Sequence, residues 1–279
     1  MKLSIKEVEQ FNTEGYVASV RVFPKTEINT LRTALEAVEA IQGGVLKPSQ
    51  RNKAHLLFKW LDDLIRDSRI LNPIEQLIGP NILCWNTIFW IKEARSPSFV
   101  SWHQDLTYWG FDGTEEVTVW LALSPVTKDN GCMRFLPGSH LDGIKPHKDT
   151  FSIDNSLTRG QVLEIDIDEN EAVHIILEPG EVSLHHGRMF HASGPNSTER
   201  WRLGLAMQFI TPSMQQVVAR EDYAQLVRGE DRYGHFKDLP RPKVNFDEAG
   251  IAIREQVMVA QSEALYVDSE RKPEGSDFH

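Results

Sequence analysis

Residues 82–91 read ILCWNTIFWI, the first of six short runs that are rich in β-branched and aromatic residues. The other five are bounded by Gly, Pro, Asn or Asp, and they span Glu116–Leu123, Cys132–Leu136, Ala172–Leu177, Glu181–Leu184 and Leu203–Phe209. Short strands separated by turn residues in this way are typical of an antiparallel barrel or sandwich. The sequence therefore predicts a mainly β core.

Helical patterns flank this core on both sides. Before it, apolar residues recur every three or four positions in three segments, Leu3–Phe11, Lys25–Ile41 and Leu56–Ile78, with Pro73 expected to restart the last one as its first helical residue. After it, helices are expected at Tyr223–Val227 and Glu248–Leu265. We expect a single domain over residues 1–279, with a helical region at about 1–80, the core at about 81–212, a second helical region at about 213–267 and a polar tail at 268–279.

Composition excludes several classes of protein. The chain has 30 basic and 40 acidic residues and a formal charge of -10, which disfavours a surface that coats nucleic acid. No apolar run reaches the ~18 residues of a membrane span, and the N-terminus lacks the apolar stretch of a secretion signal. The cysteines, Cys84 and Cys132, are expected to be buried small side chains. We expect a soluble, cytoplasmic monomer or homodimer that binds neither membrane nor nucleic acid.

The segment Ser101-Trp102-His103-Gln104-Asp105 places an imidazole and a carboxylate two residues apart. On an extended segment these side chains point to the same side, so both can bind one metal ion, although a surface His–Asp pair is the alternative. Any of three downstream histidines, His185, His186 and His191, can supply a third ligand. Two imidazoles and one carboxylate leave three positions open on octahedral Fe(II), as in oxygen-activating sites, whereas a structural zinc site closes all four of its positions.

Arg202 lies eleven residues after His191, where the last apolar run begins. A guanidinium can bind a carboxylate through two parallel hydrogen bonds. Arg202 is therefore a candidate to hold a carboxylate of a co-substrate on the metal, and a surface salt bridge is the alternative.

Several motifs, in this order, resemble the phytanoyl-CoA dioxygenase family: Trp102-His103-Gln104-Asp105, Tyr108-Trp109-Gly110, Val119-Trp120-Leu121-Ala122-Leu123, Asn130-Gly131-Cys132-Met133, Pro137-Gly138-Ser139-His140 and His191-Ala192-Ser193-Gly194-Pro195-Asn196. The resemblance extends from the helical N-terminus to about residue 236. It implies a double-stranded β-helix, or jelly-roll, core with helices before and after it. It also implies a non-haem oxygenase that uses Fe(II), O2 and 2-oxoglutarate as co-substrate.

The resemblance implies a role for individual residues. His103, Asp105 and His191 match the metal ligands, which are also the catalytic residues, and Arg202 matches the arginine that binds the far carboxylate of 2-oxoglutarate. Ser193, Thr118 and Trp120 match positions beside the same co-substrate. Asn86, Tyr108 and Trp109 are expected to contact the substrate. A related branch that halogenates has a small residue in place of the carboxylate ligand, so the presence of Asp105 favours hydroxylation.

The expected activity is hydroxylation of an unactivated C–H bond of a small molecule, with release of succinate and CO2. The substrate classes that the resemblance implies are polar metabolites, aminophosphonates and natural-product intermediates. Desaturation, epoxidation or rearrangement at the same site is the alternative outcome. A jelly-roll protein that binds a metal or ligand without turnover is the alternative class.

Other residues have structural interpretations. His185 and His186 are expected to support or pack beside the site, and His140 to end a strand in a turn. Lys92 and Arg134 are expected to be exposed, although either can meet an anionic substrate. The helix expected at Glu248–Leu265 is interpreted as a packing or dimer element.

Overall fold

A computed structural model describes residues 1–270. Its α-helices are α1 (Ile5–Glu14), α2 (Lys25–Gln42), α3 (Pro48–Arg51), α4 (Lys59–Leu64), α5 (Ser68–Ile78) and α6 (Glu248–Leu265). Short 3-10 helices are η1 (Ala54–Leu56), η2 (Asp105–Thr107) and η3 (Ser139–Asp142). The strands are β1 (Tyr16–Arg21), β2 (Ile82–Lys92), β3 (Val100–His103), β4 (Glu116–Ala122), β5 (Met133–Phe135), β6 (His147–Asp149), β7 (Gln161–Leu163), β8 (Val173–Ile175), β9 (Glu181–His185), β10 (His191–Ser193), β11 (Arg202–Ile210), β12 (Tyr223–Arg228) and β13 (Lys237–Asp238).

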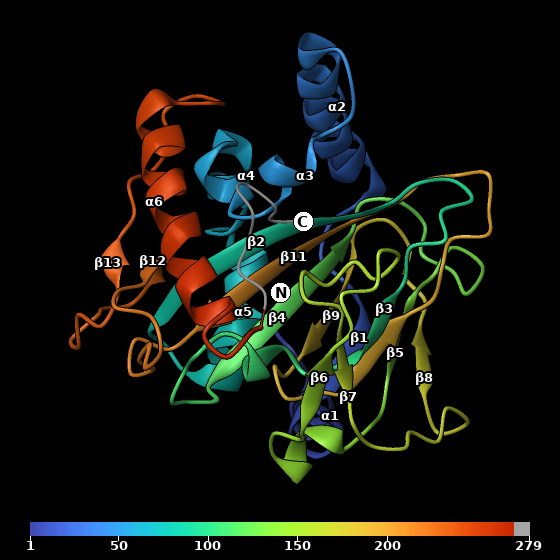
Figure 1. Cartoon of the computed structure of the whole chain (residues 1–279). Coiled ribbons are helices and arrows are strands. Elements are labelled where there is room, and N and C mark those ends of the chain that lie inside the picture. Colours follow the sequence, from blue (N-terminus) through green and yellow to red (C-terminus); the bar gives the residue numbers. More distant parts are fainter. Residues whose placement is uncertain (271–279) are drawn as a thin grey trace.

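Two antiparallel sheets form the core. The larger sheet has the strand order β1-β9-β4-β11-β2-β12-β13, the smaller one has the order β3-β10-β5-β8, and β6 pairs with β7 separately. Among the strand pairs of residues 1–270, the short β12–β13 pair at the edge is the only parallel one. Figure 1 shows the long strands β2, β11 and β4 crossing the molecule, with the smaller sheet on one side of them and α6 on the other. The predicted mainly β jelly-roll core with helices before and after it is confirmed.

Alternation along the central strands gives the larger sheet two different faces. On β4, Val117, Val119 and Leu121 belong to the large apolar cluster that includes residues of α2, α4 and α5. Thr118 and Trp120 point the other way, because successive side chains of a strand alternate between faces. Trp120 packs in a second cluster with residues of the smaller sheet. Helices α2, α4 and α5 therefore cover one face of the sheet, and the other face borders the space between the sheets.

Strand β11 must pass very close to Trp120 on that inner face. A Cβ added to Gly204 would lie 1.9 Å from a ring carbon of Trp120, whose side chain is almost fully buried. Only glycine leaves room for this ring, which packs beside the guanidinium of Arg202.

Gly204→Ala is therefore expected to lower the free energy of unfolding by about 1–3 kcal/mol, because the indole ring must leave its packed position. Urea denaturation measures the change. Gly44→Ala is the matched control, since an added Cβ there meets no atom within 4 Å. Equal stability of the two variants would contradict the close approach of β11 to Trp120.

The expectation of a helical region at 213–267 is wrong for the helix placed at Tyr223–Val227. Residues 223–227 belong to strand β12, which pairs with β2 through Gln225↔Cys84 and Leu226↔Leu83. A five-residue segment is too short to form a stable helix by itself, whereas the exposed backbone groups along β2 stabilise an added strand. Within the described residues, only α6 of this region is an α-helix.

The N-terminal region is helical as expected, but with different breaks. The segment 56–78 is divided among η1, α4 and α5, and the Asp67 side chain caps α5 by accepting a hydrogen bond from the Arg69 amide at 2.8 Å. Pro73 lies inside α5 and does not begin it, so that expectation is wrong. The apolar stretch at 16–22 forms β1, which extends the larger sheet beyond β9.

Three other expectations concern the chain as a whole. Cys84 and Cys132 are buried free thiols, as predicted. Among residues 1–270, no helix is both long enough and apolar enough to cross a bilayer. The expected polar tail at 268–279 lies mostly outside the described residues, and the single-domain organisation stays a prediction.

Candidate metal centre and adjoining pockets

Strands β3 and β10 bring two histidines together. His103 ends β3, His191 begins β10, and the two are direct partners in the antiparallel ladder. Their rings lie 4.0 Å apart between centroids, tilted by 47°. Asp105 Oδ1 is 3.2 Å from Nε2 of His103 and 3.8 Å from Nε2 of His191. These ligand atoms all lie within 4.8 Å of one another, so a single ion can contact all three.

Asp105 reaches this position by a route that the sequence did not predict. It was expected to continue the extended segment of His103, but it begins the 3-10 helix η2. The turn is held by the Leu106 amide, which donates to the carbonyl of Gly187 at 3.0 Å. The carboxylate and the imidazole therefore converge because the chain bends after Gln104, and the two-residue period of a strand is not the cause.

Both imidazoles are oriented by backbone carbonyls. Nδ1 of His103 lies 2.8 Å from the carbonyl of Ser101, and Nδ1 of His191 lies 3.0 Å from that of Met189. A carbonyl can only accept, so each Nδ1 carries the hydrogen and each Nε2 keeps its lone pair on the side of Asp105. Two neutral imidazole nitrogens are thus held ready to bind a metal.

The charges of the triad suit a divalent cation. Burial alone would raise the pKa of Asp105, but the adjacent His191 and His103 lower it to about 2, so its carboxylate is ionised at neutral pH. Burial lowers the pKa of His191 to about 4, which keeps that imidazole neutral. Two neutral nitrogens and one carboxylate oxygen form the ligand set of non-haem Fe(II) sites with open positions.

One cavity beside the triad is lined by every residue that was expected to bind 2-oxoglutarate. Arg202, Ser193, Thr118 and Trp120 all line it together with the three triad residues. Arg202 comes from the start of β11, Ser193 from the end of β10, and the other two from β4. The cavity thus joins the inner faces of both sheets.

Arg202 is a buried cation without an acidic partner among residues 1–270. Its side chain is 2% exposed, Nη1 donates to the carbonyl of Gly131 at 2.7 Å, and Nε has no hydrogen-bond partner. Its guanidinium lies 5.3 Å from the centre of the Trp120 ring. Burial lowers the pKa of Arg202 to about 10. An unpaired buried charge is costly, so this pocket is suited to an anion that pairs with the guanidinium.

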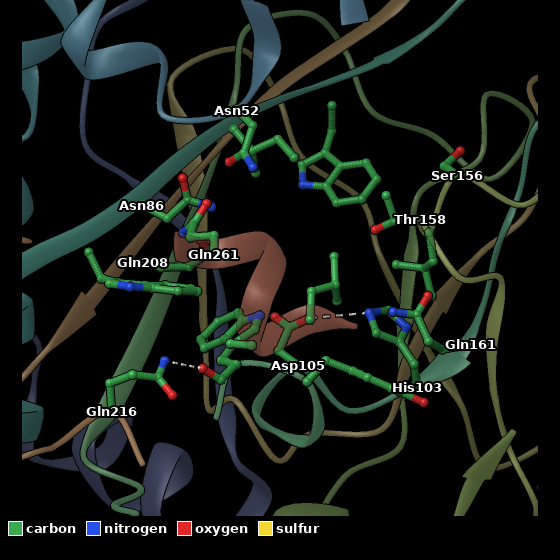
Figure 2. A pocket seen from close by; sticks show the side chains of 18 residues that line it. Asn52, Asn86, His103, Asp105, Ser156, Thr158, Gln161, Gln208, Gln216 and Gln261 are labelled. Carbon is green, nitrogen blue, oxygen red and sulfur yellow. Dashed lines mark hydrogen bonds and ion pairs between the residues drawn. The ribbon is translucent and has the colours of Figure 1, made fainter. Parts of the chain in front are cut away.

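A second cavity lies on the other side of His103 and Asp105. Asn86, Tyr108 and Trp109, the three residues expected to contact substrate, all line it. Figure 2 shows Asp105 and His103 facing the same space as Asn86, Gln208 and Gln261 on the left of the view, with Ser156, Thr158 and Gln161 on the right. The aromatic wall includes Trp85 and Trp109, whose ring centroids are 4.8 Å apart.

Helix α6 takes part in this second cavity. Gln261, Ala264 and Leu265 line it from the C-terminal half of the helix. The helix is fixed there by Arg254, which donates to the carbonyl of Asn52, and by its Leu265 carbonyl, which accepts from Arg159. The interpretation of this helix as a packing or dimer element alone therefore missed its contribution to the cavity.

A polar row across the larger sheet connects the two cavities. His185, Thr118, Gln208 and Asn86 are consecutive cross-strand neighbours on β9, β4, β11 and β2. His185 lines the first cavity, and Gln208 lines both. The sequence reasoning missed Gln208, although a glutamine within the apolar run 203–209 was an available signal.

The remaining singled-out residues lie outside both cavities. His140 contacts the carbonyl of Asn12 through Nε2 at 3.2 Å, and its ring lies 5.4 Å from that of His186. Arg134 pairs with Glu169. Lys92 was expected to be exposed but is buried, where its Nζ donates to the carbonyls of residues 193 and 194. These contacts are structural.

Comparison with known sequences gives one family. The sequence profile described as "Phytanoyl-CoA dioxygenase (PhyH)" matches residues 11–204. The human protein named "Phytanoyl-CoA dioxygenase, peroxisomal" is 32% identical over 236 residues, which cover 74% of this chain and 68% of the human one. A protein of Stutzerimonas stutzeri, "Probable alpha-ketoglutarate-dependent hypophosphite dioxygenase", is 32% identical over 53% of this chain, and the match spans about half, 52%, of that relative's length.

Solved structures agree with this result. The protein described as "non-heme monooxygenase; ThoJ apo" has a TM-score of 0.81 at 36% identity, and the match covers 93% of this chain and 97% of that one. "CytC3 with Fe(II) and alpha-ketoglutarate" has a TM-score of 0.63 at 22% identity, over 88% of this chain and 96% of that one. The second likeness concerns the fold alone.

Proposed function

Because the chain belongs to the phytanoyl-CoA dioxygenase family, we propose that it is an Fe(II)- and 2-oxoglutarate-dependent oxygenase that hydroxylates an unactivated C–H bond of a small molecule. The sequence relatives compared above are named as dioxygenases, and one protein with a similar fold is described with Fe(II) and alpha-ketoglutarate. The products would be the hydroxylated substrate, succinate and CO2.

The observation that carries this proposal is the placement of an unpaired buried arginine in the cavity of the triad. His103, Asp105 and His191 would bind the iron. Arg202, in the same cavity, would pair with the far carboxylate of 2-oxoglutarate and thereby remove the cost of its buried charge. A dicarboxylate that also reaches the metal fits both requirements.

Each residue then has a defined task in the reaction. Bound Fe(II), with 2-oxoglutarate and O2, supplies the oxidation chemistry through decarboxylation to succinate. The protein orients the reactants: Arg202 fixes the direction in which the co-substrate lies, and Ser193 and Thr118 offer hydroxyls within the same cavity. Trp120 supplies an apolar surface beneath the guanidinium and excludes water from it.

The second cavity would hold the substrate beside the triad. Asn86, Tyr108 and Trp109 line it, and it shares His103 and Asp105 with the co-substrate cavity. The candidate substrates are a polar metabolite, an aminophosphonate or a natural-product intermediate.

The outcome of the reaction is a separate question. Desaturation, epoxidation or rearrangement would use the same residues. Asp105 favours hydroxylation over halogenation, because its carboxylate takes the position that a halide would need.

Succinate release from 2-oxoglutarate, in the presence of Fe(II) and ascorbate, tests the proposal directly. Slow turnover without substrate is expected, since the proposed metal ligands and Arg202 line one cavity and need no substrate to come together. Succinate formation should disappear on chelation with EDTA and return with added Fe(II). A chain that binds Fe(II) and 2-oxoglutarate but never forms succinate would instead be a jelly-roll binding protein.

A further inference from the structure

The substrate cavity is lined by neutral side chains. Among the described residues that line it, the only acid is Asp105 and the only imidazole is His103, and both belong to the metal triad. No lysine or arginine lines it within residues 1–270. Carboxylates and phosphates bind in buried sites through such cations. The charge of a metal held by the triad would be offset by Asp105 and the 2-oxoglutarate dianion, so an anionic group would lose its hydration in this cavity without gaining a counter-charge.

Carboxamide side chains provide most of the hydrogen-bonding groups instead. Four of them are held through their oxygens by backbone amides. One of the four, Gln216, accepts from the amides of Val218 and Ala219 and already donates its NH2 group to the carbonyl of Trp109, so it offers no free donor. The other three keep that group available. Asn52 and Asn86 both accept from the Lys53 amide, at 3.0 and 3.2 Å, and Gln161 accepts from the Arg159 amide at 3.2 Å. An anchored amide oxygen leaves the NH2 group as the free end. The cavity therefore presents fixed, uncharged N–H donors.

Gln208 adds the complementary group. Its side chain is 7% exposed, and its Oε1 has no hydrogen-bond partner among the described residues. A buried carboxamide in this state loses the free energy of a hydrogen bond that a ligand can restore. Gln208 lies beside Asn86 in the ladder between β11 and β2, so an acceptor and a donor stand next to each other.

We propose that this cavity binds an uncharged substrate that carries amide groups, the chemistry of a peptide or a carboxamide, and that it discriminates against carboxylates and phosphonates. An amide offers a carbonyl to the Asn86 NH2 group and an N–H to the Gln208 oxygen. The Trp85–Trp109 wall packs against an apolar or aromatic part of the same molecule. The inference rests on the proposed function in taking the triad as the reacting centre, and it disfavours the aminophosphonate class.

Matched probes test the charge preference. N-acetyl-phenylalaninamide and N-acetyl-phenylalanine share one skeleton and differ in an amide or carboxylate end. Their dissociation constants would be measured by tryptophan fluorescence on protein loaded with Mn²⁺ and 2-oxoglutarate. The amide is expected to bind about tenfold or more tightly, a difference of about 1.4 kcal/mol. Equal or tighter binding of the carboxylate, or no binding of the amide up to its solubility limit, would overturn the proposal.

Asn86→Asp tests the donor. The substitution keeps the oxygen that accepts from Lys53 and replaces the NH2 group with a second oxygen, so amide affinity is expected to fall about tenfold. Asn245→Asp is the control, since that exposed asparagine also accepts from a backbone amide, that of Lys59 at 3.0 Å. Gln161→Glu repeats the test on a second element if Asn86→Asp unfolds. If Asn86→Asp or Gln161→Glu folds and still binds N-acetyl-phenylalaninamide as tightly as the unmodified protein does, the proposal is contradicted.

Failure of the two proposals can be told apart. Binding of Mn²⁺ and 2-oxoglutarate is measured on the same samples, and it depends on the triad and Arg202. Loss of that binding together with a retained amide preference would refute the oxygenase and leave the ligand preference intact. Normal co-substrate binding with a preference for the carboxylate probe would refute only the substrate class.

Discussion

Asp105→Ala is expected to lower the affinity for the metal by more than about 100-fold and to abolish succinate formation. Removing a group that only supports a ligand costs roughly 10–100-fold, so removing a ligand should cost more. Asp105 is also the only anionic member of the triad, and its Oδ1 lies between the two Nε2 atoms at 3.2 and 3.8 Å. Without it, two neutral imidazoles would have to bind a dication alone.

The measurement is Mn²⁺ binding followed by electron paramagnetic resonance, with succinate formation under Fe(II) as the second readout. Asp142→Ala is the control, because Asp142 is an exposed aspartate at the end of η3. Thermal unfolding without metal checks that the variant folds. Wild-type affinity for Mn²⁺ in folded Asp105→Ala would show that the metal lies elsewhere, and the proposed function would then fail.

The triad could be proposed from the sequence because part of its spacing is local and several family motifs occur in order around it. His103 and Asp105 lie two residues apart, and the family motif identifies His191 among three candidate histidines. The reason for their convergence was not predictable, since the turn into η2 depends on a hydrogen bond to Gly187, far along the chain. Residue type therefore indicated the chemistry, while tertiary contacts determined the geometry.

The substrate cavity was much less visible in the sequence. Asn86 was proposed as a substrate contact from its place in the first strand, but Gln208 reaches the cavity only through the register that places it between Thr118 and Asn86. Gln261 comes from α6, more than fifty residues later, and no local pattern connects it with the core. The same limit applies to β12, which was expected to be helical and whose pairing with β2 lies far away in the sequence.

Arg202→Met is expected to raise the dissociation constant for 2-oxoglutarate by about 30-fold or more, while the ligand-free protein changes in stability by less than about 1 kcal/mol. The loss of affinity follows from leaving a buried carboxylate without its cation, which costs 2–5 kcal/mol in comparable pairs. The small effect on stability follows because Arg202 is buried and has no acidic partner among residues 1–270, and replacing such a charge by an apolar side chain is often neutral or stabilising. Within residues 1–270, the substitution removes the hydrogen bond to the Gly131 carbonyl and the contact of the guanidinium with the Trp120 ring, which the apolar methionine side chain can still cover.

The two halves of this prediction separate a ligand-binding arginine from a structural one. Calorimetric titration of 2-oxoglutarate into Mn²⁺-loaded protein measures affinity, and urea denaturation of the ligand-free protein measures stability. Arg200→Met is the control, because Arg200 is exposed two residues earlier and should change neither quantity. If Arg202→Met destabilised the ligand-free protein by several kcal/mol and left 2-oxoglutarate affinity unchanged, Arg202 would be a structural residue. A buried guanidinium whose removal costs affinity but not stability is one whose charge is retained for its ligand.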